Sequence, residues 1–421
     1  MHIRSSKTSL TCAVGFVLIT SLPIQAWAGA AYIYEFGSPT DVGTAGAGFA
    51  VKAQNASTVF GNPAGMTRFD QPELLAAGVG MYLKLPFQPD GKTTVDGSDG
   101  QSSEFSGTGS FGYIHPITPS LSVGVSAQNY FGLALDWSSK WVGRYEVVDE
   151  TLIAPQVQPT VAWKVNDWLS VGGGAALTLG YLADKKRVFN ADPARGDGKL
   201  RYSDTDFAVQ GNFGIMIEPN ERTRFGLRYL TETELNFKDG LHLSNVGPIV
   251  GQAKGEALEL QIRMPQAVNF SAFHQLNDQW ALLGDIGWEE WSCFGQINVQ
   301  VDPSGNTSKL DLNMRDVWHF GVGAQYQYTP QWLLTAGVSY DTSMSTDKTR
   351  PVQLPLGTMY RYGVGFEYEK RKELTIGAGL DFMWEGNLPV APAGNALAGE
   401  VSGKYENVYF VFASVYGKWT F

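Results

Sequence analysis

Charged residues, cysteines and long apolar runs are all scarce in this sequence. Only 17% of the 421 residues are charged and the formal net charge is -10, which argues against a nucleic-acid partner. After residue 28 no stretch of about 18 consecutive apolar residues occurs, which excludes membrane-spanning helices. The cysteines are Cys12 and Cys293. Because Cys12 falls in an expected leader, the one remaining thiol is too few for an internal disulfide or a cysteine metal cluster.

The sequence also lacks the usual signatures of an enzyme. There is no Gly-x-Ser-x-Gly motif and no paired-carboxylate constellation, and the glycine runs at 172–174 and 321–323 lack the third glycine and the following helix of a nucleotide loop. The histidines are scattered without metal-ligand spacing: His2, His115, His242, His274 and His319. We therefore predict no catalytic residues, no metal and no cofactor.

The first 28 residues have the pattern of a signal peptide. Arg4 and Lys7 precede the apolar run Leu10–Ile24, and Ala26-Trp27-Ala28 supplies the small residues that signal peptidase requires. The alternative is an uncleaved anchor, but the run is shorter than the ~20 residues of a spanning helix and Pro23 interrupts it. We expect export across a membrane and removal of residues 1–28.

The rest of the chain alternates between strand-like stretches and turns. Fourteen such stretches can be counted, an even number, and every second connection between them is long, as in outer-membrane barrels with short periplasmic turns and long external loops. The stretches are 73–84, 105–115, 121–130, 152–164, 168–182, 204–217, 223–237, 258–273, 279–301, 312–328, 332–341, 359–368, 373–384 and 404–421. They predict an all-β fold, a 14-stranded antiparallel transmembrane β-barrel over residues 73–421.

Period-two alternation within the stretches supports a lipid-facing surface. Trp318, Phe320 and Val322 fall on one face of their stretch, whereas His319 and the neighbouring glycines fall on the other. The chain ends in Phe421, which is typical of barrels that the barrel-assembly machinery recognises. A soluble β-sandwich or propeller is the structural alternative, because soluble strands also alternate.

Residues 29–72 do not fit the barrel pattern, because they are small and rich in glycine and alanine. They carry Phe36, Gly43, the run Ala45–Phe49, Ser57–Phe60 and the triplet Asn62-Pro63-Ala64. In this order they resemble the N-terminal hatch of the FadL family of outer-membrane transporters for long-chain fatty acids and other hydrophobic compounds. Further matches follow in family order at Trp141–Tyr145, Asn166–Ser170, Trp288–Trp291, Ala336–Asp341 and Leu354-Pro355.

The resemblance implies a fold, a function and a set of partners. The barrel of a Gram-negative outer membrane would enclose residues 29–72 as a hatch, and a ligand would pass from an external groove to a site beside the hatch and leave sideways at a kinked third strand. We expect uptake of long-chain fatty acids. Aromatic hydrocarbons by the same route, a porin-like channel and an adhesin are the alternatives. Expected partners are hydrophobic small molecules, lipopolysaccharide and the assembly machinery through Phe421, and we expect a monomer.

Candidate ligand contacts lie in the hatch, in an apolar external loop and at one strand end. The candidates are Tyr32, Tyr34, Phe36, Phe131, Leu133, Trp137, Trp141, Lys186 and Arg187, and the hatch motif is Asn62, Pro63 and Ala64. We expect loops 131–151 and 238–257 to expose apolar side chains for ligand landing, although packing of the loops on each other would explain the same residues. The basic pair would hold an acidic head group or, alternatively, lipopolysaccharide phosphates. The motif would hold the hatch against the wall or merely form a turn.

Overall fold

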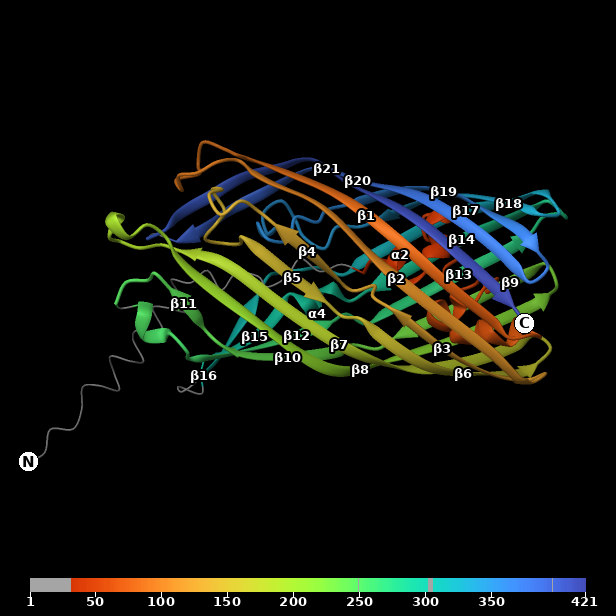
Figure 1. The fold of residues 1–421 in the computed structure, drawn as a ribbon. Coiled ribbons are helices and arrows are strands. Elements are labelled where there is room, and N and C mark those ends of the chain that lie inside the picture. Colours follow the sequence, from red (N-terminus) through yellow and green to blue (C-terminus); the bar gives the residue numbers. More distant parts are fainter. Residues whose placement is uncertain (1–31, 249, 302–305, 396) are drawn as a thin grey trace, which may run out of the picture.

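The computed structural model describes residues 32–248, 250–301, 306–395 and 397–421. Fourteen strands form a closed antiparallel ring, each paired with the next, and β1 pairs with β21 to complete it (Figure 1). The ring strands are β1 (Glu73–Pro89), β2 (Gly100–Thr118), β3 (Leu121–Gln128), β6 (Gln156–Asn166), β7 (Leu169–Val188), β8 (Gly198–Asn220), β9 (Thr223–Leu230), β13 (Ala267–Gln275), β14 (Trp280–Glu289), β17 (Val317–Thr329), β18 (Trp332–Asp341), β19 (Met359–Arg371), β20 (Leu374–Asn395) and β21 (Gly399–Thr420). The predicted 14-stranded barrel is confirmed. Among the described residues, no helix is long and apolar enough to cross a membrane.

The side chains of the ring alternate between an apolar outer face and a mixed inner face. Trp318, Phe320 and Val322 of β17 are exposed, whereas His319 between them points inward and is partly buried. Apolar side chains that are exposed around a closed ring are suited to hydrocarbon, and ring closure leaves no strand edge unpaired. The interior is filled, because the N-terminal residues of the described chain lie within it (Figure 1).

Three of the expected stretches are interrupted, which corrects their predicted extents. The stretch 223–237 divides into β9 and β10 (Thr233–Gly240), 258–273 into β12 (Ala257–Met264) and β13, and 279–301 into β14, the short helix α4 (Trp291–Phe294) and β15 (Gln296–Val301). The parts outside the ring join β16 (Asn306–Asp311) in a separate four-stranded sheet in the order β10, β12, β15, β16. Pro265 marks one of the breaks, because it has no N–H group to continue a ladder.

The third stretch also ends earlier than expected. β3 stops at Gln128, and the chain continues as β4 (Gly132–Asp136), which pairs with β5 (Asp149–Ile153) rather than with β2. β5 pairs with the part of β7 that extends beyond its pairing with β6, and the short strand β11 (His242–Ser244) pairs with β8. The wall of the ring is therefore discontinuous where β3 ends between β2 and β6.

The N-terminal segment, residues 32–72, consists of short helical turns inside the ring. These turns are α2 (Tyr34–Gly37), η1 (Pro39–Thr44), α3 (Thr58–Gly61) and η2 (Pro63–Arg68), and nearly all their side chains are buried. η1 packs on β17 to β21, and η2 packs on β2, β3 and β6 to β8 on the other side. Glycines permit this approach, because a Cβ atom at Gly337 or Gly226 would overlap the carbonyl oxygen of Thr44 or of Ala50.

We predict that Gly337→Val displaces the N-terminal segment but leaves the ring closed. The added side chain would meet the backbone of Thr44, whereas the ring's hydrogen bonds do not depend on that contact. The matched control is Gly78→Val, because a Cβ atom at Gly78 has no neighbour within 4 Å. Limited proteolysis should cut the N-terminal segment only in the first variant, while both variants keep the shift in gel mobility on heating. An intact segment in Gly337→Val would contradict the close contact.

Candidate functional site

Aromatic side chains from three parts of the chain gather where the N-terminal segment begins. This aromatic cluster consists of Tyr32, Tyr34, Tyr130, Phe131 and Trp291. The Tyr32 ring centroid lies 5.7 Å from that of Tyr34, 5.3 Å from Tyr130, and 5.5 Å from both Phe131 and Trp291. The structure thus brings the predicted contacts Tyr32, Tyr34 and Phe131 together, and adds Tyr130, which follows β3, and Trp291 of α4.

Phe36, the third aromatic candidate in the N-terminal segment, lies apart from this cluster. Its ring packs edge-on against Phe412 of β21, with the ring centroids 5.9 Å apart, and its side chain is buried. The geometry therefore accounts for Phe36 as packing between the segment and the wall, and a ligand contact there stays a prediction.

A buried arginine borders the aromatic cluster. The guanidinium of Arg228, on β9, lies 5.9 Å from the ring centroid of Tyr34 in the cluster and 4.6 Å from that of the neighbouring Phe60. It donates hydrogen bonds to Asn212 Oδ1 at 3.1 Å and to Asn269 Oδ1 at 3.4 Å. These partners among the described residues are neutral side-chain amides, and the Nη2 atom of Arg228 has no hydrogen-bond partner. A buried cation without a carboxylate partner is suited to an anionic head group.

A chain of buried charges connects the N-terminal segment to the wall. Arg361 Nη1 on β19 donates to Glu35 Oε1 of α2 at 2.5 Å, and its Nε lies 3.0 Å from Asp341 Oδ2 on β18. The other Asp341 oxygen lies 2.7 Å from Nδ1 of His319 on β17. One arginine thus neutralises a carboxylate of the segment and a carboxylate of the ring, so that removing it would leave both charges buried.

The Asn62-Pro63-Ala64 triplet lies against the opposite wall. The Asn62 amide nitrogen donates to Ala50 O at 2.7 Å and to Ile215 O of β8 at 3.0 Å, while Asn62 Oδ1 accepts from Ala64 N at 3.1 Å. Pro63 starts η2 and packs beside Gly172 of β7. The motif therefore contacts the wall directly as well as forming a turn, which supports the predicted holding role.

Most apolar side chains of the two external loops are buried, whereas Val246 and Val250 are half-buried, so the alternative of loop packing describes them better than exposure for ligand landing. Trp137 and Trp141 stack with centroids 5.4 Å apart and are 2% and 0% exposed, and Trp141 Nε1 donates to Val147 O at 2.8 Å. Leu241 and Leu243 of the second loop are also buried. The two indoles of the first loop pack against each other because removing their large apolar surface from water lowers the free energy of the folded protein. The side chain of Leu133, on β4, lies outside the described set.

The basic pair at the end of β7 is divided between the two faces of the strand. Lys186 is buried and its Nζ lies 3.3 Å from Asp184 Oδ2, whereas Arg187 is half-buried on the other face. The loop residue Glu146 also faces Lys186; burial raises the pKa of Glu146 to about 7, and the nearby lysine opposes that shift. Because carboxylates already surround Lys186, it is a weaker candidate for a head-group contact than Arg228.

A lateral cavity opens on the lipid-facing side where β3 ends. It has a volume of about 680 Å³ and is lined by residues 108–111, 127–129, 155–157, 177–179 and 207. Its rim carries exposed apolar side chains, among them Phe207 and Leu177. The strand predicted from the sequence extends to residue 130, two residues past Gln128, where the hydrogen-bonded ladder ends.

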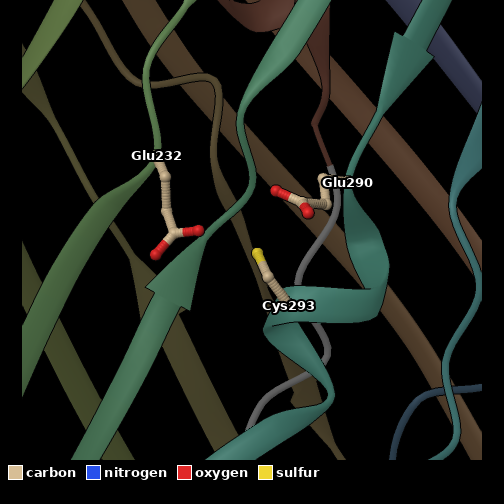
Figure 2. Close-up of side chains that lie close together, drawn as sticks. All are labelled: Glu232, Glu290 and Cys293. Atoms are coloured by element: carbon tan, nitrogen blue, oxygen red, sulfur yellow. The ribbon is translucent and has the colours of Figure 1, made fainter.

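One cluster outside the ring has the donor atoms of a metal site. The thiol of Cys293 lies between the carboxylates of Glu232 and Glu290, and their ligand atoms lie within 4.8 Å of one another (Figure 2). However, Arg263 Nη1 lies 3.6 Å from Glu232 Oε1, and the amide of Gln266 donates to Glu290 Oε2 at 2.7 Å. Burial, reinforced by Glu232, raises the pKa of the thiol to about 12. Since metals bind the thiolate, we assign no metal here.

The comparisons with known proteins agree with this architecture. Residues 19–419 match the family model described as outer membrane protein transport protein (OMPP1/FadL/TodX). The chain belongs to this family. It is therefore a transport protein of the Gram-negative outer membrane and not an enzyme, as predicted.

Individual relatives span nearly the whole chain. A long-chain fatty acid transport protein of Escherichia coli O6:H1 is 23% identical over 414 residues, which cover 90% of this chain and 92% of the relative. The crystal structure of a Pseudomonas aeruginosa FadL homologue superposes with a TM-score of 0.81 at 20% identity, covering 90% of this chain and 97% of the other. The toluene transporter TbuX of Ralstonia pickettii has a TM-score of 0.65 at 18% identity, covering 91% and 98%. These two structural similarities show that the chain shares the fold of both proteins.

We predict that Arg361→Met loosens the start of the N-terminal segment. The change leaves Glu35 and Asp341 buried without their cation, which typically costs about 3–5 kcal/mol. Amide hydrogen exchange in α2 and η1 should become faster, while gel mobility still shifts on heating. Arg371→Met, at an exposed end of β19, is the control and should change neither. Unchanged exchange in α2 would show that the ion pair does not hold the segment.

Proposed function

We propose that this protein takes up hydrophobic compounds through the outer membrane, with long-chain fatty acids as the preferred class. The substrates named for the E. coli and R. pickettii relatives, long-chain fatty acids and toluene, support this proposal. In our proposal residues 1–28 are the signal peptide, which lies outside the described residues, residues 29–72 are the hatch, and residues 73–421 are the barrel. Binding to lipopolysaccharide, recognition of Phe421 by the assembly machinery and a monomeric state belong to the same proposal.

The lateral cavity is the observation that carries the proposal. It interrupts an otherwise paired wall and opens among lipid-facing side chains. One of its lining residues, Asn129, immediately precedes Tyr130 of the aromatic cluster in the sequence. A ligand that moves sideways through this break enters the bilayer without returning to water. For an alkyl chain the avoided cost is about 0.8 kcal/mol per CH₂ group. The hatch, buried across the ring, blocks the axial path and so disfavours a porin-like channel.

Arg228 favours acids over hydrocarbons within this class. Its guanidinium has an unpartnered nitrogen beside the aromatic cluster, so a fatty acid could place its head there and its tail among the rings. Uptake of aromatic hydrocarbons is the second candidate, because the rings of Tyr32, Tyr34 and Tyr130 would also receive an uncharged aromatic ligand.

We predict that Ala127→Trp blocks uptake by filling the lateral cavity. Ala127 lines this cavity on β3 and is half-buried, so a large ring there would occupy the path. In Gram-negative cells that lack a channel of this family, uptake of labelled myristate should fall by about tenfold or more, each factor of ten corresponding to about 1.4 kcal/mol of added barrier.

The matched control is Ala336→Trp, at an exposed alanine on the far wall, which should keep normal uptake. Outer-membrane abundance and heat-dependent mobility must be equal for all three proteins. Normal myristate uptake by Ala127→Trp would overturn the lateral route, and a large steady ion conductance of the wild-type protein in planar bilayers would favour a porin.

A further inference from the structure

The lateral cavity contains no charged side chain. Its fourteen lining residues are apolar or neutral, and the polar ones include Gln128, Gln156 and Thr178. An ionised head group in this cavity would therefore have no cation to pair with, and burial of an unpaired carboxylate is strongly unfavourable. Whatever passes through this cavity is best matched when it carries no charge.

Gln128 has unused hydrogen-bonding capacity at both polar atoms of its side chain. It is the last residue of β3 and is 4% exposed, yet neither its amide nitrogen nor its amide oxygen has a partner. Its cross-strand neighbour Gln156 donates to Thr178 Oγ1 and to Gln210 Oε1, both at 2.9 Å, but the Gln156 oxygen also has no partner. Buried amides are normally bonded, and leaving one unsatisfied lowers stability.

A neutral carboxylic acid is the chemical complement of this amide. The amide N–H can donate to the carbonyl oxygen of the acid, and the amide oxygen can accept its O–H. An alcohol makes one of these bonds at a time, a carboxylate or a sulfate offers no donor, and a hydrocarbon leaves both amide atoms unsatisfied. The amide nitrogen and oxygen of Gln128, which have no partner, therefore favour neutral polar head groups over both anions and hydrocarbons.

We propose that Gln128 is a specificity-determining residue of the lateral exit and binds the head of an amphiphilic ligand in its neutral form, as a protonated carboxylic acid or an alcohol. This inference rests on the proposed function. The head would meet the Arg228 guanidinium beside the aromatic cluster as a carboxylate, take one proton from a hydronium ion of the solvent, and pass Gln128 as the neutral acid. The hydronium ion is left as a water molecule, and no other covalent bond forms or breaks.

The test compares one alkyl chain with four heads in cells that carry the wild-type protein, Gln128→Met or Gln101→Met. The probes are labelled myristic acid, myristyl alcohol, tetradecane and tetradecyl sulfate. Methionine keeps the length of glutamine without its hydrogen bonds, and Gln101 is an exposed residue of β2 that serves as the matched control. Initial uptake rates are divided by outer-membrane abundance.

We expect Gln128→Met to lower the rates for the acid and the alcohol by about tenfold relative to tetradecane, as expected for the loss of one or two buried hydrogen bonds. Gln101→Met should match wild type, and the sulfate should pass through none of the three. Uptake of tetradecane shows whether the path through the protein is intact, so a misfolded variant is recognised by the loss of uptake of all probes. In that case the comparison is repeated with Gln128→Asn, which keeps an amide.

Other outcomes would overturn the assignment. Equal rates in Gln128→Met and wild type, an equal loss for acid and hydrocarbon, or passage of the sulfate as fast as the acid would each show that Gln128 does not read the head group. If wild-type cells take up none of the probes faster than cells without the protein, the proposed function itself fails, which is a different result.

Discussion

Backbone hydrogen bonding in a medium without water is the constraint on which this structure depends. Each strand of the ring satisfies its amides on the next strand, and the pairing of β1 with β21 leaves no free edge. The end of β3 is the place where this rule is relaxed. Pro155 lies in the break and has no N–H to satisfy, while its carbonyl oxygen accepts from Leu179 N at 3.0 Å. The wall can therefore open there while few backbone N–H and C=O groups lose a hydrogen-bond partner.

The interior has to combine tight packing with a path for ligands. Glycines at Gly226 and Gly337 let the N-terminal segment touch the wall, and the Glu35–Arg361–Asp341 chain fixes its first turn. The other face of the segment meets aromatic rings and Arg228 instead of complementary charge. One side of the segment is thus held by specific polar contacts, whereas the side toward the aromatic cluster is held by apolar surface that a ligand could replace.

The sequence predicted the strand number and the closed ring, because alternation and turn chemistry are local properties that repeat along the chain. The family was predicted separately, from the resemblance of short motifs such as Asn62-Pro63-Ala64 in their order along the chain. The sequence also placed Tyr32, Tyr34 and the Asn62 motif in the right region. It did not predict Arg228, Arg361 or Gln128, since each is one polar residue on the inner face of a strand, and the sequence does not show which inner positions meet across the ring. For the same reason the sequence left open whether Trp137 and Trp141 are exposed or packed, and the structure shows that they are buried.

The position of the N-terminal segment has a consequence for the order of assembly. Glu73 of β1 pairs with Thr420 of β21, so the contact that closes the ring joins the two ends of the part of the chain that forms the ring. Contacts between residues so distant in sequence form slowly, because a long loop must close first. The segment immediately precedes β1 and packs on strands from both halves of the ring, with η2 on β2, β3 and β6 to β8 and η1 on β17 to β21. Its packing surface is therefore complete only when the last seam has formed, which couples the burial of the segment to the closure of the ring.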